Sequence, residues 1–176
     1  MKASTFSLVG LAGRYAEAAS LLKEPGDCAV VERAGIRRQI LVFCPDGCGE
    51  TLSINLDPAS GPAWRLYQRR GRWSLFPSID RPTGCKSHFI LWSGGILWCE
   101  PDSHGEEPEV VDGLVRQIRE AMRPGQTIGF VAISQKLDDV PWDILRCCRQ
   151  MVRDGLLVEG IGQQLGNFML KTEAQP

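Results

Sequence analysis

Two short segments of the chain carry side chains of the types that bind transition metals. Three residues, Pro-Asp-Gly, separate Cys44 from Cys48, and two residues separate Cys85 from His88. Pro and Gly beside these pairs favour tight turns, which let both side chains of a pair point at one place. Three thiolates and one imidazole make a complete tetrahedral set for zinc. The spacing therefore predicts a zinc site at Cys44, Cys48, Cys85 and His88.

A protein that fills all four coordination positions leaves none for water or substrate, so a structural zinc ion is expected rather than a catalytic one. An iron–sulfur cluster is the alternative. A Rieske centre, however, takes one Cys and one His from each half, and the first half here offers two thiols. The other four cysteines are expected to be buried apolar residues; they are Cys28, Cys99, Cys147 and Cys148.

The remaining residues offer little for catalysis once His88 is assigned to the metal. The other histidine, His104, lies in a segment rich in Pro, Gly and charge. No glycine-rich phosphate-binding spacing follows a predicted strand. Asp46 and Glu50 lie beside the first cysteine pair, as supporting groups or as a general base. This inventory favours a non-enzymatic protein but leaves the question of catalysis open.

Composition narrows the class of protein. The chain has 176 residues, 43% of them hydrophobic, and a formal charge of −1, so it can form a packed core and has no general attraction to nucleic acid or acidic membranes. Its seven cysteines are odd in number, which disfavours a secreted disulfide framework and favours the cytoplasm. No apolar run reaches the roughly 18 residues that a membrane helix needs.

The elements that must position the metal ligands are mostly strands. A helix is expected at 14–24, ending at Pro25-Gly26. Apolar or alternating segments bounded by turn residues follow it and predict five further features. These are strands at 29–33, 38–43 and 51–56, an aromatic hairpin at 64–77 with its turn at Arg70-Gly71, and a hairpin at 89–99. Residues 1–100 are therefore predicted to form a β-rich domain held by the zinc ion.

Beyond a predicted linker at 101–109 the apolar period changes to that of helices. Helices are expected at 110–122 and 139–153, with a strand-like run at 128–133 and a short helix capped by Ser134 between them. Two strands at 156–159 and 167–171 follow. Helix, helix–turn–helix and a two-stranded wing predict a winged-helix-like domain at 110–171, and an α+β fold for the whole chain.

Two groups of arginines are candidates for contacts with nucleic acid or a protein partner. Arg146, Arg149 and Arg153 share one face of the predicted helix at 139–153. The second group lies among aromatic residues in the hairpin at 64–77 and comprises Arg65, Arg69, Arg70 and Arg72. Residues 106–176 carry eight Lys and Arg against eleven Asp and Glu, and this excess of negative charge disfavours phosphate binding. Strand alternation alone accounts for the hairpin pattern.

The order of several segments resembles an uncharacterised bacterial family of predicted metal-binding proteins. The segments include Cys44-Pro-Asp-Gly-Cys-Gly-Glu50, Ser74-Leu-Phe-Pro-Ser78 and Cys85-Lys-Ser-His-Phe-Ile-Leu-Trp92, and the likeness covers about residues 25–99. Members are encoded beside a ubiquitin-like modifier, activating-like and conjugating-like enzymes and a JAB-type peptidase, in operons similar to antiphage defence systems. The family usually has a cysteine where this chain has Asp46, which puts any role for a middle thiol in doubt.

The resemblance implies a part in ubiquitin-like conjugation, with the modifier or its enzymes as partners. Together with the closed metal site, it predicts a non-enzymatic zinc-binding adaptor that acts by protein–protein contact. The alternative is a nucleic-acid-binding protein that uses the winged helix or the arginine-rich hairpin.

Overall fold

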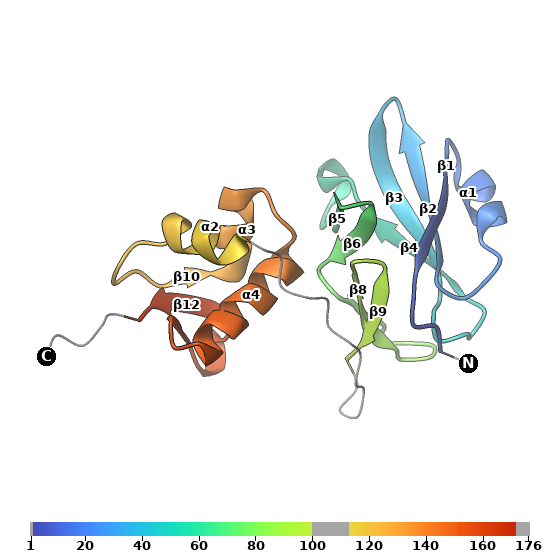
Figure 1. The fold of residues 1–176 in the computed structure, drawn as a ribbon. Helices are drawn as coiled ribbons and strands as arrows, with labels where there is room; N and C mark the ends of the chain where they lie inside the picture. Colours follow the sequence, from blue (N-terminus) through green and yellow to red (C-terminus); the bar gives the residue numbers. More distant parts are fainter. Residues whose placement is uncertain (1, 100–112, 172–176) are drawn as a thin grey trace, which may run out of the picture. The chain divides into compact units, whose positions relative to one another are not determined.

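The computed structural model describes residues 2–99 and 113–171 (Figure 1). The chain divides into two compact units, Met1–Pro108 and Glu109–Pro176, and each is described by itself below. The first is rich in β-strands and the second combines helices with a small sheet, so the expected α+β class is confirmed. The predicted linker at 101–109 lies outside the described residues, and the domain boundaries drawn from the sequence stay predictions.

A four-stranded sheet organises the first unit. Its order is β1 (Ser7–Ala12), β2 (Asp27–Arg33), β3 (Ile36–Phe43) and β4 (Thr51–Asn55); β1 runs parallel to β2, and the other pairs are antiparallel. Between β1 and β2 lies the helix α1 (Tyr15–Leu21). The β2–β3 turn places Ala34 and Gly35 at φ 50° and 75°, the left-handed conformation that two-residue hairpin turns favour.

The two faces of this sheet bury different sets of side chains, because successive residues of a strand point to opposite sides. On one face α1 packs through Ala18 against the sheet residues Ala29, Val31 and Leu41. The other face joins the main core of the unit, whose sheet residues are Cys28, Val30, Ile40, Val42 and Ile54. Figure 1 shows α1 beside β1 and β2.

Two smaller sheets complete the first unit. One pairs β5 (Arg65–Arg69) with β6 (Arg72–Phe76), and the other has the order β7 (Ile79–Asp80), β8 (His88–Trp92) and β9 (Gly95–Trp98). A short 3₁₀ helix, η1 (Pro58–Ser60), precedes them. Their inward residues close the main core, namely Leu75, Ile79, Phe89, Leu91 and Ile96. The two hairpins predicted from the sequence are confirmed, whereas the strands β1 and β7 were not anticipated.

The second unit packs three helices against a three-stranded sheet. In chain order its elements are α2 (Leu114–Ala121), β10 (Ile128–Gly129), α3 (Phe130–Leu137), α4 (Pro141–Arg153), β11 (Leu157–Glu159), η2 (Gly162–Gln164) and β12 (Asn167–Leu170). The antiparallel sheet has the order β10-β12-β11. Its core draws on every helix, with Ile118, Ile133, Ile144, Met151 and Phe168 at 0% exposed.

The strand-like run predicted at 128–133 is wrong beyond Gly129. The strand ends there and α3 begins at Phe130, so Ser134 lies inside the helix, where its hydroxyl donates to the carbonyl of Val131 at 3.0 Å. A short apolar run fits either a strand or a buried helix, and here the helix buries Ile133 completely. In the described ranges no helix is long and apolar enough to cross a membrane.

Phe89 gives the sharpest test of the first core, because its ring is fully buried between the sheets. We expect Phe89→Ala to lower the free energy of unfolding by about 3–5 kcal/mol, since it removes a large side chain from a packed interior. Chemical denaturation followed by tryptophan fluorescence measures this. Leu11→Ala, on a residue 59% exposed, is the control and should change stability by less than about 0.5 kcal/mol. Equal effects of the two substitutions would contradict this core.

Candidate functional site

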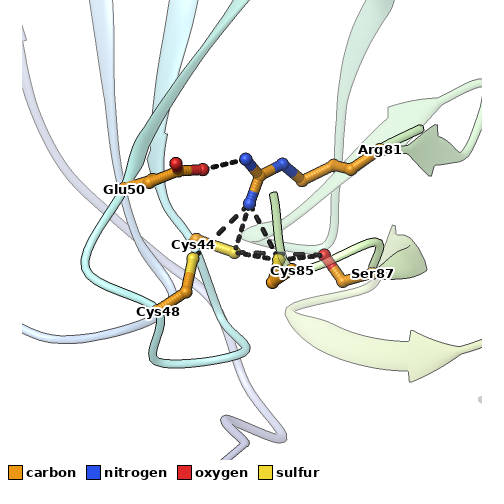
Figure 2. Close-up of polar contacts among 6 residues, drawn as sticks. All are labelled: Cys44, Cys48, Glu50, Arg81, Cys85 and Ser87. Atoms are coloured by element: carbon orange, nitrogen blue, oxygen red, sulfur yellow. Dashed lines mark hydrogen bonds and ion pairs between the residues drawn. The ribbon is translucent and has the colours of Figure 1, made fainter. Parts of the chain in front are cut away.

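Three cysteine sulfurs meet at one end of the first unit. Cys44 follows β3 directly, Cys48 lies in the turn before β4, and Cys85 lies in the loop between β7 and β8. The three Sγ atoms lie within 4.8 Å of one another, and those of Cys44 and Cys85 are 3.7 Å apart. We call Cys44, Cys48 and Cys85 the sulfur cluster (Figure 2). The sequence prediction that distant turns bring these three thiols together is confirmed.

A cationic side chain points into the sulfur cluster. Arg81 Nη1 lies 2.8 Å from Cys85 Sγ and 3.5 Å from both Cys44 Sγ and Cys48 Sγ. The other terminal nitrogen of Arg81 forms an ion pair with Glu50 (Figure 2). The three sulfurs therefore surround the positive charge of the guanidinium. The sequence did not single out Arg81, although its position four residues before Cys85 could have indicated that it lies near the cluster.

Cys44 and Cys85 have different pKa values because their surroundings differ. Burial raises the pKa of Cys44 to about 11, although a hydrogen bond from the Asp46 backbone opposes this. Burial also acts to raise the pKa of Cys85, but hydrogen bonds from the hydroxyl and backbone of Ser87 outweigh it and lower that pKa to about 7. The Ser87 hydroxyl is 3.2 Å from Cys85 Sγ. Cys85 therefore ionises near neutral pH, whereas Cys44 does not.

The sulfur cluster fits a metal ion in donor type and spacing. A tetrahedral zinc site with Zn–S bonds of about 2.3 Å separates its sulfurs by about 3.8 Å, close to the 3.7 Å between Cys44 and Cys85. Thiolates are the ligands that zinc prefers. Because Arg81 already lies among the same sulfurs, a metal ion and the guanidinium are alternatives at this place. The three cysteines can thus hold a metal ion.

Within the part of the chain that the structure describes, the possible metal ligands that gather here are the three cysteines, and His88 is not one of them. Its Nε2 lies instead 3.1 Å from Ser78 Oγ. A hydroxyl within hydrogen-bonding distance of an imidazole is the arrangement of a serine nucleophile and its general base. The sequence analysis missed Ser78 because it assigned His88 to the metal and then found no other base. The four-ligand set stays a prediction in its His88 member.

The strand register explains why Ser78 and His88 meet. Asp80 on β7 is opposite His88 on β8, and Ser78 lies two residues before Asp80. Residues two apart share a face of a strand, so Ser78 is a diagonal neighbour of His88, within reach of a long side chain. The neighbouring pair, Ile79 and Phe89, faces the core. The Ser78–His88 pair therefore lies on the opposite, outer face of this small sheet, and both side chains are partly exposed.

Comparison with protein families gives a match across most of the first unit. Residues 15–99 match the BubE family. The model of that family describes a serine protease of a bacterial ubiquitination-like system. The matched range includes the sulfur cluster and the Ser78–His88 pair. Comparisons with curated proteins and with solved structures found no match.

This match confirms the expected link to a ubiquitin-like conjugation system and overturns the predicted function. The sequence analysis expected a non-enzymatic adaptor, with nucleic-acid binding as the alternative, whereas BubE is described as a protease. The error has an identifiable source. The Cys85–His88 spacing is typical of half a zinc site, and a histidine assigned to a metal is not available as a general base.

Two of the three arginines predicted to form a stripe on α4 have partners within the second unit. Arg149 forms an ion pair with Glu159 at 3.4 Å, and the Arg153 guanidinium donates to Gln150 Oε1 at 2.7 Å. Arg146 lies on the same helix, α4, and is partly buried. These contacts occupy part of the predicted stripe, and contact of this stripe with another molecule stays a prediction.

The arginines of the β5–β6 hairpin are exposed, and the aromatic residues near them contribute to the core. Trp64 and Trp73 are partly buried and pack against the main core, and contact of this hairpin with another molecule stays a prediction. Arg37 lies over the Trp73 ring, with Cζ 5.3 Å from its centroid. The four exposed arginines are Arg65, Arg69, Arg70 and Arg72. Strand alternation accounts for this pattern.

The lowered pKa of Cys85 predicts its reactivity. In metal-free protein, we expect iodoacetamide to modify Cys85 with a pH midpoint near 7, because its thiolate forms above that value. Ser87→Ala removes the hydroxyl hydrogen bond, so the midpoint should move upward. Peptide mass spectrometry at successive pH values measures this, with the buried Cys28, whose pKa is raised, as the slow control. A Cys85 midpoint near 9 would contradict the expectation.

Proposed function

We propose that this protein is a serine protease in which Ser78 is the nucleophile and His88 the general base. The observation that carries the proposal is the 3.1 Å contact between Ser78 Oγ and His88 Nε2. His88 is also the histidine inside the family match, because the other one, His104, falls beyond residue 99. A protease of this class needs a hydroxyl beside a base, and this pair provides it.

In the proposed reaction, Ser78 Oγ attacks the carbonyl carbon of the scissile bond while His88 Nε2 accepts the hydroxyl proton. The imidazolium then donates that proton to the leaving amine as the carbon–nitrogen bond breaks, which leaves an acyl group on Ser78. Water, deprotonated by His88, hydrolyses the ester and restores both residues. Nε2 can accept only if the histidine proton is on Nδ1, so this chemistry requires one tautomer.

Cys99 follows β9 and is the neighbour of His88 across the ladder, but its chemistry is less suitable for a nucleophile. Its backbone N–H donates to the His88 carbonyl at 2.9 Å. Burial and then the negative charge of Asp80 raise the pKa of Cys99, so it stays a thiol at neutral pH. The thiolate is the nucleophilic form of cysteine. Ser78, in contact with a base, is the better candidate.

The family description points to substrates within a bacterial ubiquitination-like system. We take the substrate to be the ubiquitin-like modifier, either as a precursor or attached to a target, because a protease in such a system acts on the bonds of the modifier chain. Its conjugation enzymes are the other partners that the resemblance implies. The pair lies on the outer face of a small sheet, where a protein substrate has access.

A structural zinc ion at the sulfur cluster is part of the proposal. Cys44, Cys48 and Cys85 would hold it, and the ion would supply a fixed link between the β3–β4 turn and the β7–β8 loop. That loop joins the strand after Ser78 to the strand that begins with His88. We also keep, as a proposal, the winged-helix-like description of the second unit, since its order of helices and strands agrees with that arrangement.

Removal of the nucleophile tests the proposed function. We expect Ser78→Ala to abolish labelling by a fluorophosphonate probe and to lower cleavage of the precursor modifier by about 10³-fold or more, because it removes the hydroxyl that forms the acyl intermediate. Ser53→Ala is the matched control, because Ser53 is an exposed serine on β4 whose hydroxyl donates to Gln39 Oε1 at 2.6 Å. Full labelling of Ser78→Ala would refute the assignment.

Metal analysis separates the two roles considered for His88. Elemental analysis of the purified protein should give about one zinc per chain, and Cys44→Ser should lose both the zinc and much of the stability, since metal binding and folding are coupled. As a general base, His88 can be replaced by Ala with the zinc retained and probe labelling lost. Loss of zinc from His88→Ala would identify it as the fourth ligand instead.

A further inference from the structure

Three polar side chains form one row across the small sheet that carries His88. Asp80 on β7 is opposite His88 on β8, and the next strand continues the row with Cys99, just after β9. The Cys99 N–H donates to the His88 carbonyl at 2.9 Å, which confirms that these two residues are neighbours. The adjacent row, Ile79, Phe89 and Trp98, packs into the core. Asp80 and His88 therefore share the outer face.

The hydrogen bonds of the ladder show what kind of pair Asp80 and His88 make. The Arg81 N–H donates to the Ser87 carbonyl at 3.0 Å, so Arg81 and Ser87 form a hydrogen-bonded pair. Pairs alternate along an antiparallel ladder, and the next pair, Asp80 with His88, is therefore of the non-hydrogen-bonded kind. In that kind the Cα atoms are only about 4.5 Å apart and the side chains lie closest. In such a pair the Cβ atoms lie about 4.5–5.5 Å apart, so a rotation of either side chain can bring the Asp80 carboxylate to the imidazole. The structure shows no hydrogen bond or ion pair between these two side chains.

The imidazole has its two nitrogens available for different partners. Its Nε2 is at Ser78 Oγ, 3.1 Å away, on one diagonal of the strand pair. The opposite nitrogen, Nδ1, is left to a neighbour that must accept its proton if Nε2 is to act as a base. Asp80, directly across the ladder, is the acidic side chain in position to do so.

We propose that Asp80 is the positioning residue of this site, accepting a hydrogen bond from His88 Nδ1 and holding the imidazole in the tautomer that lets Nε2 deprotonate Ser78. This inference rests on the proposed protease function and adds the third member of its machinery. Asp80 does not itself take up the proton from Ser78. It fixes the ring and stabilises the imidazolium that forms when Nε2 is protonated.

The exposure of Asp80 sets the size of the expected effect. Asp80 is exposed at the sheet edge, whereas the orienting aspartate of a buried triad is shielded from water. Water weakens the electrostatic part of the interaction, since charges in a high dielectric interact less strongly. We therefore expect a loss of about 10-fold to 100-fold on removal of the carboxylate, below the roughly 10⁴-fold effect known for a buried triad aspartate.

The test measures the rate of labelling of the full-length protein by a fluorophosphonate. In this reaction a bond forms between Ser78 Oγ and phosphorus, the phosphorus–fluorine bond breaks, and the hydroxyl proton goes to His88. Asp80→Asn and Asp80→Ala should slow labelling by about 10-fold to 100-fold, while Asp80→Glu, which keeps the carboxylate, should restore most of the rate. Glu17→Gln, an exposed carboxyl change on α1, should have no effect.

Nitrogen-15 NMR of the imidazoles gives a readout that a merely structural role would not move. The chain has two histidines, so the spectrum of His88→Ala assigns the signals. Wild type should show His88 protonated on Nδ1, and Asp80→Ala should shift the tautomer balance. Asp80→Ala that labels at the wild-type rate, or one that slows with an unchanged tautomer, would overturn the role of Asp80. Labelling that survives Ser78→Ala would instead refute the protease assignment itself.

Discussion

The loop from Arg81 to Ser87 is the constraint on which the proposed site depends. One of its ends continues from β7, just after Ser78, and the other leads into His88. Between these ends, Arg81 and Cys85 are held against Cys44 and Cys48, which come from the turn before β4. Sulfur, guanidinium and carboxylate contacts thus fix a segment that would otherwise be a free surface loop. The Ser78–His88 geometry follows from how that segment is closed.

Closure of this kind matters because the two strands involved are short. β7 has two residues and β8 has five, so their ladder alone gives few hydrogen bonds to set the position of one strand against the other. Burial of Ile79 and Phe89 adds an apolar anchor beneath the outer face. The core below and the sulfur cluster at the loop together place two polar side chains to within hydrogen-bonding distance.

Most of the strands, and the proximity of the three cysteines, could be predicted from the sequence. Hairpins with Arg70-Gly71 and Ser93-Gly94 at their turns have local signals, and the turn residues adopt the positive φ that such turns require. The pairs Cys44–Cys48 and Cys85–His88 can be recognised in the sequence from their spacing and from the glycines beside them. Strand β7 is too short to give a periodic signal, and β1 pairs in parallel with a strand beyond α1, which no local pattern specifies.

The site was harder to foresee because one residue type serves two chemistries. A histidine three residues after a cysteine, such as His88 after Cys85, can be a zinc ligand or a general base. The sequence of this segment does not show which of the two roles applies. What decides is which face His88 takes and what is opposite it, and both depend on the β7–β8 register. Ser78 carried no signal of its own, since a serine after a proline is common in turns. The family match points to a class of activity, and the Ser78–His88 contact supports our proposal of the residues that perform it.

The same register carries a consequence for how this part of the chain tolerates change. Side chains alternate between the two faces, so a slip of β8 by a single position would turn His88 into the apolar interior and bring Phe89 out to water. Lengthening or shortening the 81–87 segment would also move Cys85 relative to its sulfur neighbours Cys44 and Cys48. The cysteine contacts therefore help to hold the register of these two short strands, and that register decides whether the Ser78 hydroxyl and the His88 imidazole, our proposed nucleophile and base, lie together.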